Sequence, residues 1–303
     1  FNHPNLYLLA LFLKIKNKDK PFTFHMRTML EDLYEGTAEY IFSKNINKFL
    51  SKFLAKKQIK IISKVSEKVI FISNNEKKSY QRLGGYRDGE IIYNLLSNIS
   101  NNVHLKLIDE KRFKIAAIEN YRWSRGTDRL IEIAEELKHN NRNDIVFVVA
   151  GDMTIQNSQK SKLNSSFNKY RTLIEYVKSK GLSNYFIFLG HVSKPEEVIL
   201  GCNALVSLTR RAGPWGRSVI EAMKMQKLVI STGPNQGFIT DNKTGIYIKN
   251  YDPQVLAKRI ILIIDDKVKL LSMSLAGYKY INLKTDKEKN TQKIIKIWKK
   301  LVV

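Results

Sequence analysis

The feature that most constrains the fold is the regular alternation of short apolar runs with amphipathic stretches after residue 111. The stretch DRLIEIAEELKHN has helical spacing, with one face formed by Leu130, Ile131, Ile133, Ala134 and Leu137. Strands that alternate with helices in this way predict an α/β fold with a parallel, doubly wound sheet. The runs that we interpret as buried strands are FKIAAI (113–118), DIVFVVAG (144–151), YFIFLG (185–190), NALVSL (203–208), LVIST (228–232) and GIYIK (245–249).

The first 110 residues carry a weaker version of the same pattern. Strand candidates are PFTFH at 21–25, KVIFIS at 68–73 and EIIYN at 90–94. Between the first two, residues 37–64 are predicted to be helical. One face repeats lysine every four residues, and the opposite face carries Ile46, Phe49, Leu50, Phe53 and Leu54. This pattern suits a core helix with a solvated lysine face, or an interfacial helix lying on anionic lipid.

Length and composition allow two domains. The chain has 303 residues, 43% of them hydrophobic, and its longest apolar run, LYLLALFL, is too short to span a bilayer. The single cysteine, Cys202, excludes a disulfide framework, fits a cytoplasmic location and is expected to be buried. The chain starts at Phe1 in the middle of a patterned stretch, so we expect a missing N-terminal portion.

The chain carries a net charge of +24, from 52 basic and 28 acidic residues. Such a charge favours polyanions: nucleic acid, anionic lipid or phosphorylated substrates. The lysines are scattered rather than clustered, which also fits a plain composition bias. Because no RNA- or DNA-binding motif is present, we expect no nucleic-acid partner.

Two loops after predicted strands carry residues suited to binding phosphate or a flat ring. In ENYRWSRGTDRL, Arg122 and Arg125 precede a helix, where guanidinium groups and free N–H groups together bind phosphate well. A solvated basic loop is the alternative. In LGHVSKPEE, Gly190 permits close backbone approach, and His191 is either a ligand contact or an ordinary loop histidine.

A third loop, RRAGPWGRSVIEAM, leads into a helix that begins near Gly216. Arg217 and Ser218 lie in its first turn, where the helix dipole stabilises a phosphate. Glu221 stands one turn further on, among apolar positions. A carboxylate accepts two hydrogen bonds and can hold a vicinal diol such as a ribose; an exposed helix acid is the alternative.

Residues 111–266 resemble the donor-binding domain of the family 4 glycosyltransferases. The resemblance rests on the ordered pieces FKIAAI, the RG before the first helix, VVAGD, IFLGHV, NALVSL, PWGRSVIEAMKMQKLVIST and TGIYI. The family implies a GT-B fold, with two Rossmann-like domains facing a cleft. On this basis residues 1–110 are a partial acceptor-binding domain, 111–285 bind the donor, and 286–303 form a C-terminal helix crossing back to the first domain.

The resemblance also implies chemistry: retaining transfer of a sugar from a nucleotide-diphosphate sugar to a glycan or lipid-linked acceptor, without a metal or other cofactor. The expected setting is assembly of cell-surface polysaccharide or lipopolysaccharide, in the cytoplasm, with peripheral contact at the inner face of an anionic membrane. By resemblance His25 lies near the transferred sugar and Arg125 neutralises the diphosphate. The expected donor-binding residues are Arg122, Arg125, Gly190, His191, Trp215, Gly216, Arg217, Ser218 and Glu221.

The sequence departs from the family pattern at two site positions. The family pairs Glu221 with an acid eight residues earlier, where this chain has Gly213, and a family arginine falls at Asn120. Two alternatives therefore stay open. One is a degenerate or non-catalytic GT-B nucleotide-binding protein, and the other is a GT-B nucleotide-sugar epimerase.

Overall fold

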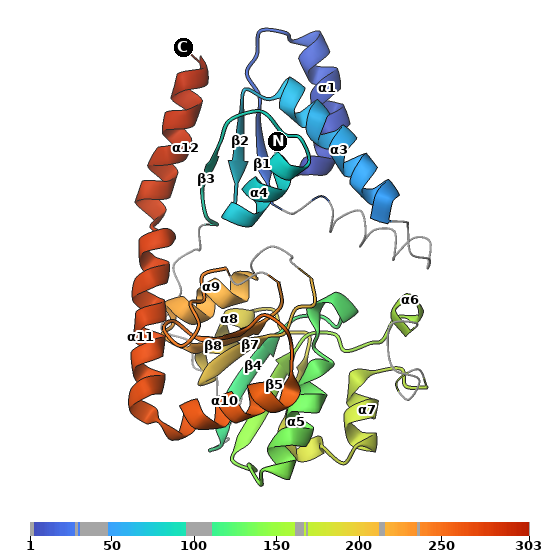
Figure 1. Cartoon of the computed structure of the whole chain (residues 1–303), viewed down its shortest axis with the longest axis vertical. Coiled ribbons are helices and arrows are strands. Elements are labelled where there is room, and N and C mark those ends of the chain that lie inside the picture. Colours follow the sequence, from blue (N-terminus) through green and yellow to red (C-terminus); the bar gives the residue numbers. More distant parts are fainter. Residues whose placement is uncertain are drawn as a thin grey trace. The chain divides into compact units, whose positions relative to one another are not determined.

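The structure is a computed structural model that describes residues 3–27, 30, 48–94, 111–160, 167, 169–211, 216–234 and 237–302. The described residues form two compact units (Figure 1). The first comprises the chain up to residue 94 together with 284–302, and the second comprises 111–211 and 216–283. The expected domain boundary at residue 110 lies outside the described residues.

The second unit is built on a six-stranded sheet with the order β6-β5-β4-β7-β8-β9, in which every neighbouring pair is parallel. The chain adds β5 and β6 on one side of β4 and then returns to add β7, β8 and β9 on the other side, as in a dinucleotide-binding fold. The predicted doubly wound parallel sheet is confirmed. Its strands are β4 (Phe113–Ile118), β5 (Ile145–Ala150), β6 (Phe186–Gly190), β7 (Ala204–Ser207), β8 (Leu228–Thr232) and β9 (Ile246–Ile248).

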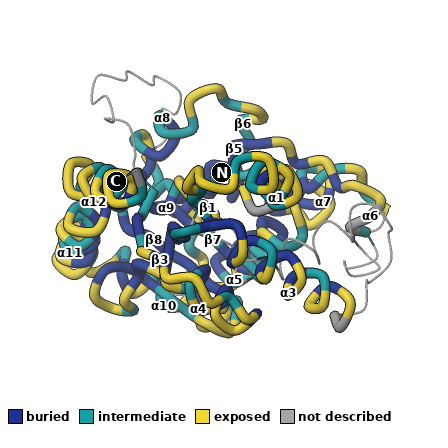
Figure 2. The backbone as a smooth tube through the Cα atoms, turned by 90° about the horizontal axis from the view of Figure 1, so that it is seen from above, coloured by how far each residue is buried: buried dark blue, intermediate teal, exposed yellow. Residues whose placement is uncertain are grey.

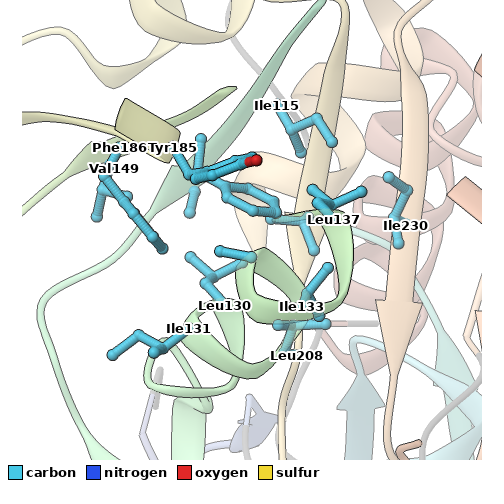
Figure 3. Close-up of a cluster of buried hydrophobic side chains, with 14 of the residues drawn as sticks. Ile115, Leu130, Ile131, Ile133, Leu137, Val149, Tyr185, Phe186, Leu208 and Ile230 are labelled. Carbon is cyan, nitrogen blue, oxygen red and sulfur yellow. The ribbon is translucent and has the colours of Figure 1, made fainter. Parts of the chain in front are cut away.

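Both faces of this sheet are covered, which explains why its strands read as continuous apolar runs. On one face, Ile115 and Val149 lie in a buried cluster with Leu130 and other residues of α5 (Arg129–His139) (Figure 3). The same cluster includes Phe147 and residues of α7 (Leu173–Ser179) and α10 (Pro253–Asp265). Residues of the other parity, such as Ala116 and Val148, are equally buried. Helices α8 (Pro195–Leu200) and α9 (Arg217–Lys224) pack beside each other and contact the strands. Short α6 (Asn157–Lys160) and long α11 (Lys267–Lys284) complete the described helices of this unit.

The first unit holds a three-stranded parallel sheet, β1-β2-β3. Its strands are β1 (Thr23–Met26), β2 (Lys68–Phe71) and β3 (Gly89–Ile91), and its helices are α1 (Tyr7–Lys16), α3 (Lys48–Val65), α4 (Asn74–Arg82) and α12 (Lys287–Val302). Phe24, Ile59 and Phe71 belong to one core beneath α1, α3 and α4. A smaller cluster joins Ile297 of α12 to Ile70 and Ile92, so the C-terminal helix packs on this sheet (Figure 1).

The helix expected at 37–64 is described from residue 48 onward. Its lysines at 52, 56, 60 and 64 are exposed, as a solvated face requires. Within the expected apolar stripe, Leu50 and Phe53 are exposed and Leu54 is half-buried, so these positions are not the buried side of the helix. Ile46 and the Phe49 side chain lie outside the described residues. The buried side is instead Ser51, Ala55, Gln58, Ile59 and Ile62, since these residues face α1 and the sheet core. Colouring by burial shows the same division into buried and exposed helix sides (Figure 2).

Cys202 is buried and unpaired by disulfide, as expected, and burial raises the pKa of its thiol to about 11. In the part of the chain that the structure describes, no helix is long and apolar enough to cross a membrane.

We predict that Phe147→Ala destabilises the second unit by about 3–5 kcal/mol, because the ring is fully buried and packs against Phe186 with the ring centroids 5.5 Å apart. Urea unfolding measures the loss. The control Val268→Ala removes an apolar side chain that is 80% exposed, and it should change the free energy of unfolding by less than about 0.5 kcal/mol. Equal effects of the two substitutions would contradict the described core.

Candidate functional site

The strand order reverses between β4 and β7, and this is where ligands bind in doubly wound sheets, beyond the carboxyl ends of the strands. Two loops leave the sheet at this point. Residues 119–128 follow β4 and carry Arg122 and Arg125, while residues 208–211 follow β7 and lead toward α9. The candidate site is therefore the carboxyl edge of the second unit.

The loop after β4 is shaped by a short helical turn, η2 (Trp123–Arg125), and by Gly126. Gly126 has a φ of +77°, in the left-handed region that glycine tolerates best. A Cβ at this position would lie 2.0 Å from the carbonyl oxygen of Leu208. Glycine is thus required at position 126, because the loop after β4 touches the loop after β7 at this point.

Arg210 ties the same two loops together. Its Nη1 donates to the Trp123 carbonyl and to Asp128 Oδ1, each at 2.7 Å, and its Nη2 donates to Asp128 Oδ2 at 2.5 Å. The guanidinium also lies over the Trp123 ring, 5.1 Å from its centroid. Burial opposes the charge, but the bonds to Asp128 outweigh it and raise the pKa of Arg210. We call this cluster of Arg210, Asp128 and Trp123 the loop clasp.

Backbone contacts reinforce the loop clasp. The Arg210 N–H donates to the Ser124 carbonyl at 2.9 Å, and the Thr209 hydroxyl donates to the same oxygen at 3.2 Å. Arg129, in the first turn of α5, donates to the Leu208 carbonyl at 3.1 Å. The turn that carries Arg122 and Arg125 is consequently held from both sides.

We predict that Arg210→Met costs about 3–5 kcal/mol in the free energy of unfolding, because it leaves the Asp128 carboxylate, 8% exposed, without its partner. Urea denaturation gives the value. Adding Asp128→Asn to this variant should recover part of the loss. The control Arg171→Met alters an exposed arginine of the same unit and should be nearly silent. A silent Arg210→Met would show that the clasp does not hold the loops.

Arg125 and Arg122 project from this turn with different surroundings. Arg122 is exposed. The Arg125 side chain is 46% exposed, and its Nε lies 3.9 Å from Glu119 Oε2. Glu119 itself is 17% exposed and accepts a long hydrogen bond, 3.5 Å, from the Thr127 hydroxyl. Burial raises the pKa of the Glu119 carboxyl to about 7, and Arg125 offsets this only in part.

Glu119 therefore makes stability depend on pH. Its folded pKa lies above its ordinary value of 4.5, so the unfolded chain loses the proton first as pH rises. The contribution of Glu119 to the free energy of unfolding is fully present below about pH 4.5. It is lost as the pH rises to about 7, by up to about 3 kcal/mol. We predict that Glu119→Gln removes this loss, measured as the difference in unfolding free energy between pH 5 and pH 8.

The matched control for this test is Glu136→Gln, at a partly exposed position on α5. It should keep the pH dependence of the unaltered chain. If the Glu119→Gln variant kept the pH dependence of the unaltered chain, the assignment of that pH dependence to Glu119 would be wrong.

Helix α9 brings the third set of predicted residues to the edge. Gly216 is its N-cap residue, and Arg217 and Ser218 open the first turn. Val219, Ile220, Ala222 and Met223 are buried, as their spacing predicts, and so is Glu221. The exposed-acid alternative for Glu221 is thus excluded: the side chain is 4% exposed, and its Oε1 accepts a 2.6 Å bond from Arg217 Nε.

The remaining predicted residues lie as follows. Gly190 has a φ of +68°, and there is open space around a Cβ built on it. His191, the next residue, is exposed. His25 is half-buried on β1 of the first unit, and burial lowers its pKa, with a smaller contribution from Arg27. Trp215 and Gly213 lie outside the described residues.

Sequence reasoning missed the loop clasp and Glu119. The guanidinium of Arg210 is bound to the Trp123 carbonyl and to Asp128, and neither contact could be read from the sequence. Nothing in the local sequence links residues 82 apart. Glu119 did carry a signal, since this acid directly follows a predicted strand and shares its loop with Arg122 and Arg125.

The described residues contain no group of three or more His, Cys, Asp and Glu side chains placed to hold a metal ion. Asp265, one of two consecutive acids, is bound instead to Arg142 at 2.8 Å. That the reaction needs no metal remains a prediction.

A family model described as Glycosyl transferases group 1 matches residues 100–280, more than half of the chain. The chain belongs to the group 1 glycosyltransferases. The match covers both loops of the candidate site and all of α9. No curated protein matches the sequence.

Solved structures extend the likeness to both units of this group 1 glycosyltransferase. Anabaena Alr3699/HepE in complex with UDP has a TM-score of 0.77, at 16% identity over 99% of this chain and 79% of that one. Sucrose-phosphate synthase from Thermosynechococcus elongatus has a TM-score of 0.71, at 13% identity over 99% and 72%. S. aureus TarM in complex with α-GlcNAc-glycerol and UDP has 0.69, at 19% identity over 98% and 53%. The expected GT-B fold class, with two Rossmann-like domains, is confirmed.

Proposed function

We propose that this group 1 glycosyltransferase is a retaining family 4 enzyme that takes its sugar from a nucleotide-diphosphate sugar. The observation that carries the proposal is the buried carboxylate of Glu221, held by Arg217 one turn into α9, at the carboxyl edge of the sheet. An acid is rarely buried on an apolar helix face without a task. A carboxylate can accept about four hydrogen bonds, so the bond from Arg217 leaves capacity for two ribose hydroxyls.

The diphosphate would lie between the turn after β4 and the start of α9. The first N–H groups of a helix have no partner within the helix and favour an anion. Arg125 and Arg122 add positive charge from the turn that the loop clasp holds. As the sugar departs, negative charge grows on the diphosphate, and fixed cations and N–H groups stabilise it without reorganising. In this proposal no metal ion or other cofactor is needed.

The donor-binding residues of the proposal are those expected from the sequence: Arg122, Arg125, Gly190, His191, Trp215, Gly216, Arg217, Ser218 and Glu221. Gly190 and His191 would meet the nucleotide base, where the open space at Gly190 suits a flat ring. From the first unit, His25 would act at the transferred sugar. Its lowered pKa keeps the imidazole neutral near pH 7, so that it can both donate and accept a hydrogen bond.

We propose a glycan or a lipid-linked saccharide as the acceptor, in the assembly of cell-surface polysaccharide, on the cytoplasmic side of the membrane. TarM was crystallised with α-GlcNAc-glycerol and UDP, and Alr3699/HepE with UDP-glucose, which supports a UDP-sugar as the first donor to try. For a lipid-linked acceptor we also propose peripheral contact with an anionic membrane.

We predict that Glu221→Gln and Arg125→Gln each weaken UDP or GDP binding at least about tenfold, because each removes a charge-assisted hydrogen bond worth about 1.5–3 kcal/mol. Isothermal titration calorimetry measures the affinities. Arg171→Gln, an exposed arginine of the same unit, is the control and should bind like the unaltered chain. Unchanged affinity in both site variants would show that the nucleotide binds elsewhere.

Gly213, in the place of a family acid, supports a second candidate: a nucleotide-binding protein that has lost transfer. Incubation with labelled UDP-glucose distinguishes the retaining enzyme, the epimerase and the degenerate protein. A glycoside with the anomeric configuration of the donor supports the retaining enzyme. A free hexose isomer indicates an epimerase, and tight nucleotide binding without any product indicates the degenerate protein.

A further inference from the structure

Glu119 is a partly buried carboxylate beside the arginine that would meet the diphosphate in the proposed function. Its main-chain N–H donates to the Ala150 carbonyl at 3.0 Å, and a Cβ on Gly151 would lie 2.4 Å from its carbonyl oxygen. Its Oε2 lies 3.9 Å from Arg125 Nε, and its Oε1 accepts a hydrogen bond from the Thr127 hydroxyl at 3.5 Å. The held main chain and a side chain only 17% exposed keep the carboxyl group beside Arg125.

Arg125 is the cation that acts on the Glu119 carboxyl group. Asp128, in the same turn, adds a like charge, but its carboxylate is bound to Arg210 by two hydrogen bonds. Asp152, in the adjoining loop after β5, is exposed, and its carboxylate accepts hydrogen bonds within that loop. Among the described residues, it is therefore Arg125 for which Glu119 and a diphosphate bound at this edge would compete.

We propose that Glu119 takes up a proton from solvent when the diphosphate of the donor binds at Arg125, so that nucleotide-sugars bind less tightly as the pH rises. A phosphate in contact with the Arg125 guanidinium also comes near the Glu119 carboxylate, and like charges at short range repel. Protonation of Glu119 removes this repulsion and leaves Arg125 to the phosphate. The inference rests on the proposed function for the place of the diphosphate.

The burial of Glu119 sets the pH range in which the coupling is expected. Without nucleotide, burial raises the pKa of its carboxyl group to about 7, and Arg125 offsets this in part. A bound diphosphate neutralises Arg125 and adds negative charge, so the pKa of Glu119 is higher still in the complex. Well below pH 7 the proton is already present in the free protein, and binding takes up none. Above pH 7 binding takes up a proton, and the affinity falls until the pKa of the complex is passed.

Isothermal titration calorimetry with UDP-glucose tests the coupling. The diphosphate of this donor is esterified at both ends, so its charge stays constant between pH 6 and pH 8.5. We expect the affinity of the unaltered chain to fall at least about fivefold over this range. At pH 8 the observed heat should differ between HEPES and Tris buffers, because the buffer supplies the proton that is taken up. GDP-mannose replaces UDP-glucose if the chain prefers a guanine nucleotide.

Glu119→Gln keeps the size of the side chain and removes its charge. This variant should bind UDP-glucose with nearly the same affinity at pH 6 and pH 8.5, and it should take up no proton. At pH 8.5 it should bind at least about fivefold more tightly than the unaltered chain, because a neutral amide does not repel the diphosphate. A residue that only supports the fold would give a loss of affinity instead, so the gain is specific to the coupling.

Glu136→Gln, on α5, is the matched control, and it should keep the pH dependence and the proton uptake of the unaltered chain. Histidine side chains also titrate near neutral pH. Since every histidine is unaltered in Glu119→Gln, a pH dependence that came from a histidine would survive in that variant. Urea unfolding at pH 6 checks that each variant is folded.

The coupling is overturned if Glu119→Gln keeps the pH dependence of the unaltered chain, if binding at pH 8 takes up no proton, or if Glu119→Gln binds more weakly at pH 8.5. Glu221→Gln at pH 6 tests the proposed function separately. If Glu221→Gln weakens binding while Glu119→Gln behaves like the unaltered chain, the coupling alone is wrong. If Glu221→Gln and Arg125→Gln both leave the affinity unchanged, or if neither nucleotide-sugar binds, the proposed donor site is wrong and the coupling with it.

Discussion

The parallel pairing of β4 with both β5 and β7 is the constraint on which the rest of the second unit depends. Because all six strands run the same way, every carboxyl end meets one edge of the sheet. Because the connection after β4 runs to β5 on one side and the connection after β7 runs to β8 on the other, their helices diverge and the loops after β4 and β7 meet each other directly. The candidate site is a consequence of this arrangement: the loops that carry Arg122, Arg125 and Arg210 and the start of α9 lie at that edge.

The loops at this edge are held by a small number of directed bonds in addition to the apolar packing of Tyr121 and Leu208 in the core. Arg210 uses its guanidinium on Asp128 and Trp123, and Gly126 allows the Leu208 carbonyl to come close. A turn held in this way presents Arg122 and Arg125 in a fixed arrangement, which an anion site needs if it is to stabilise charge without reorganising. The nearby Glu119 works against that purpose when ionised, and burial counters this by keeping it protonated up to about pH 7.

Both units bury a sheet core and leave some large apolar side chains exposed on their helices, among them Leu262 and Val268 in the second unit. In the second unit both faces of the sheet are covered, and the strands are buried along their length. In the first unit, α1 and α3 expose large apolar side chains beside lysines.

The sequence by itself determined the α/β class, the strands of the second unit to within two residues at either end and the buried face of α9. Periodicity is a local property, so the spacing of Val219, Ile220, Ala222 and Met223 is enough to predict which side of a helix is buried. The resemblance to a glycosyltransferase family was likewise carried by short ordered pieces, and the group 1 match confirmed it at the level of the family.

Only the tertiary structure decided the rest. Whether Glu221 is exposed or buried depends on what packs against α9, and no local pattern distinguishes the two. The stripe expected at Leu50 and Phe53 was wrong for the same reason, since α3 turns Ala55, Ile59 and Ile62 toward α1 and the sheet instead. The loop clasp joins residues 82 positions apart, and the raised pKa of Glu119 comes from burial. Contacts of this kind arise from the path of the chain through space, which the spacing of residues along the sequence does not specify.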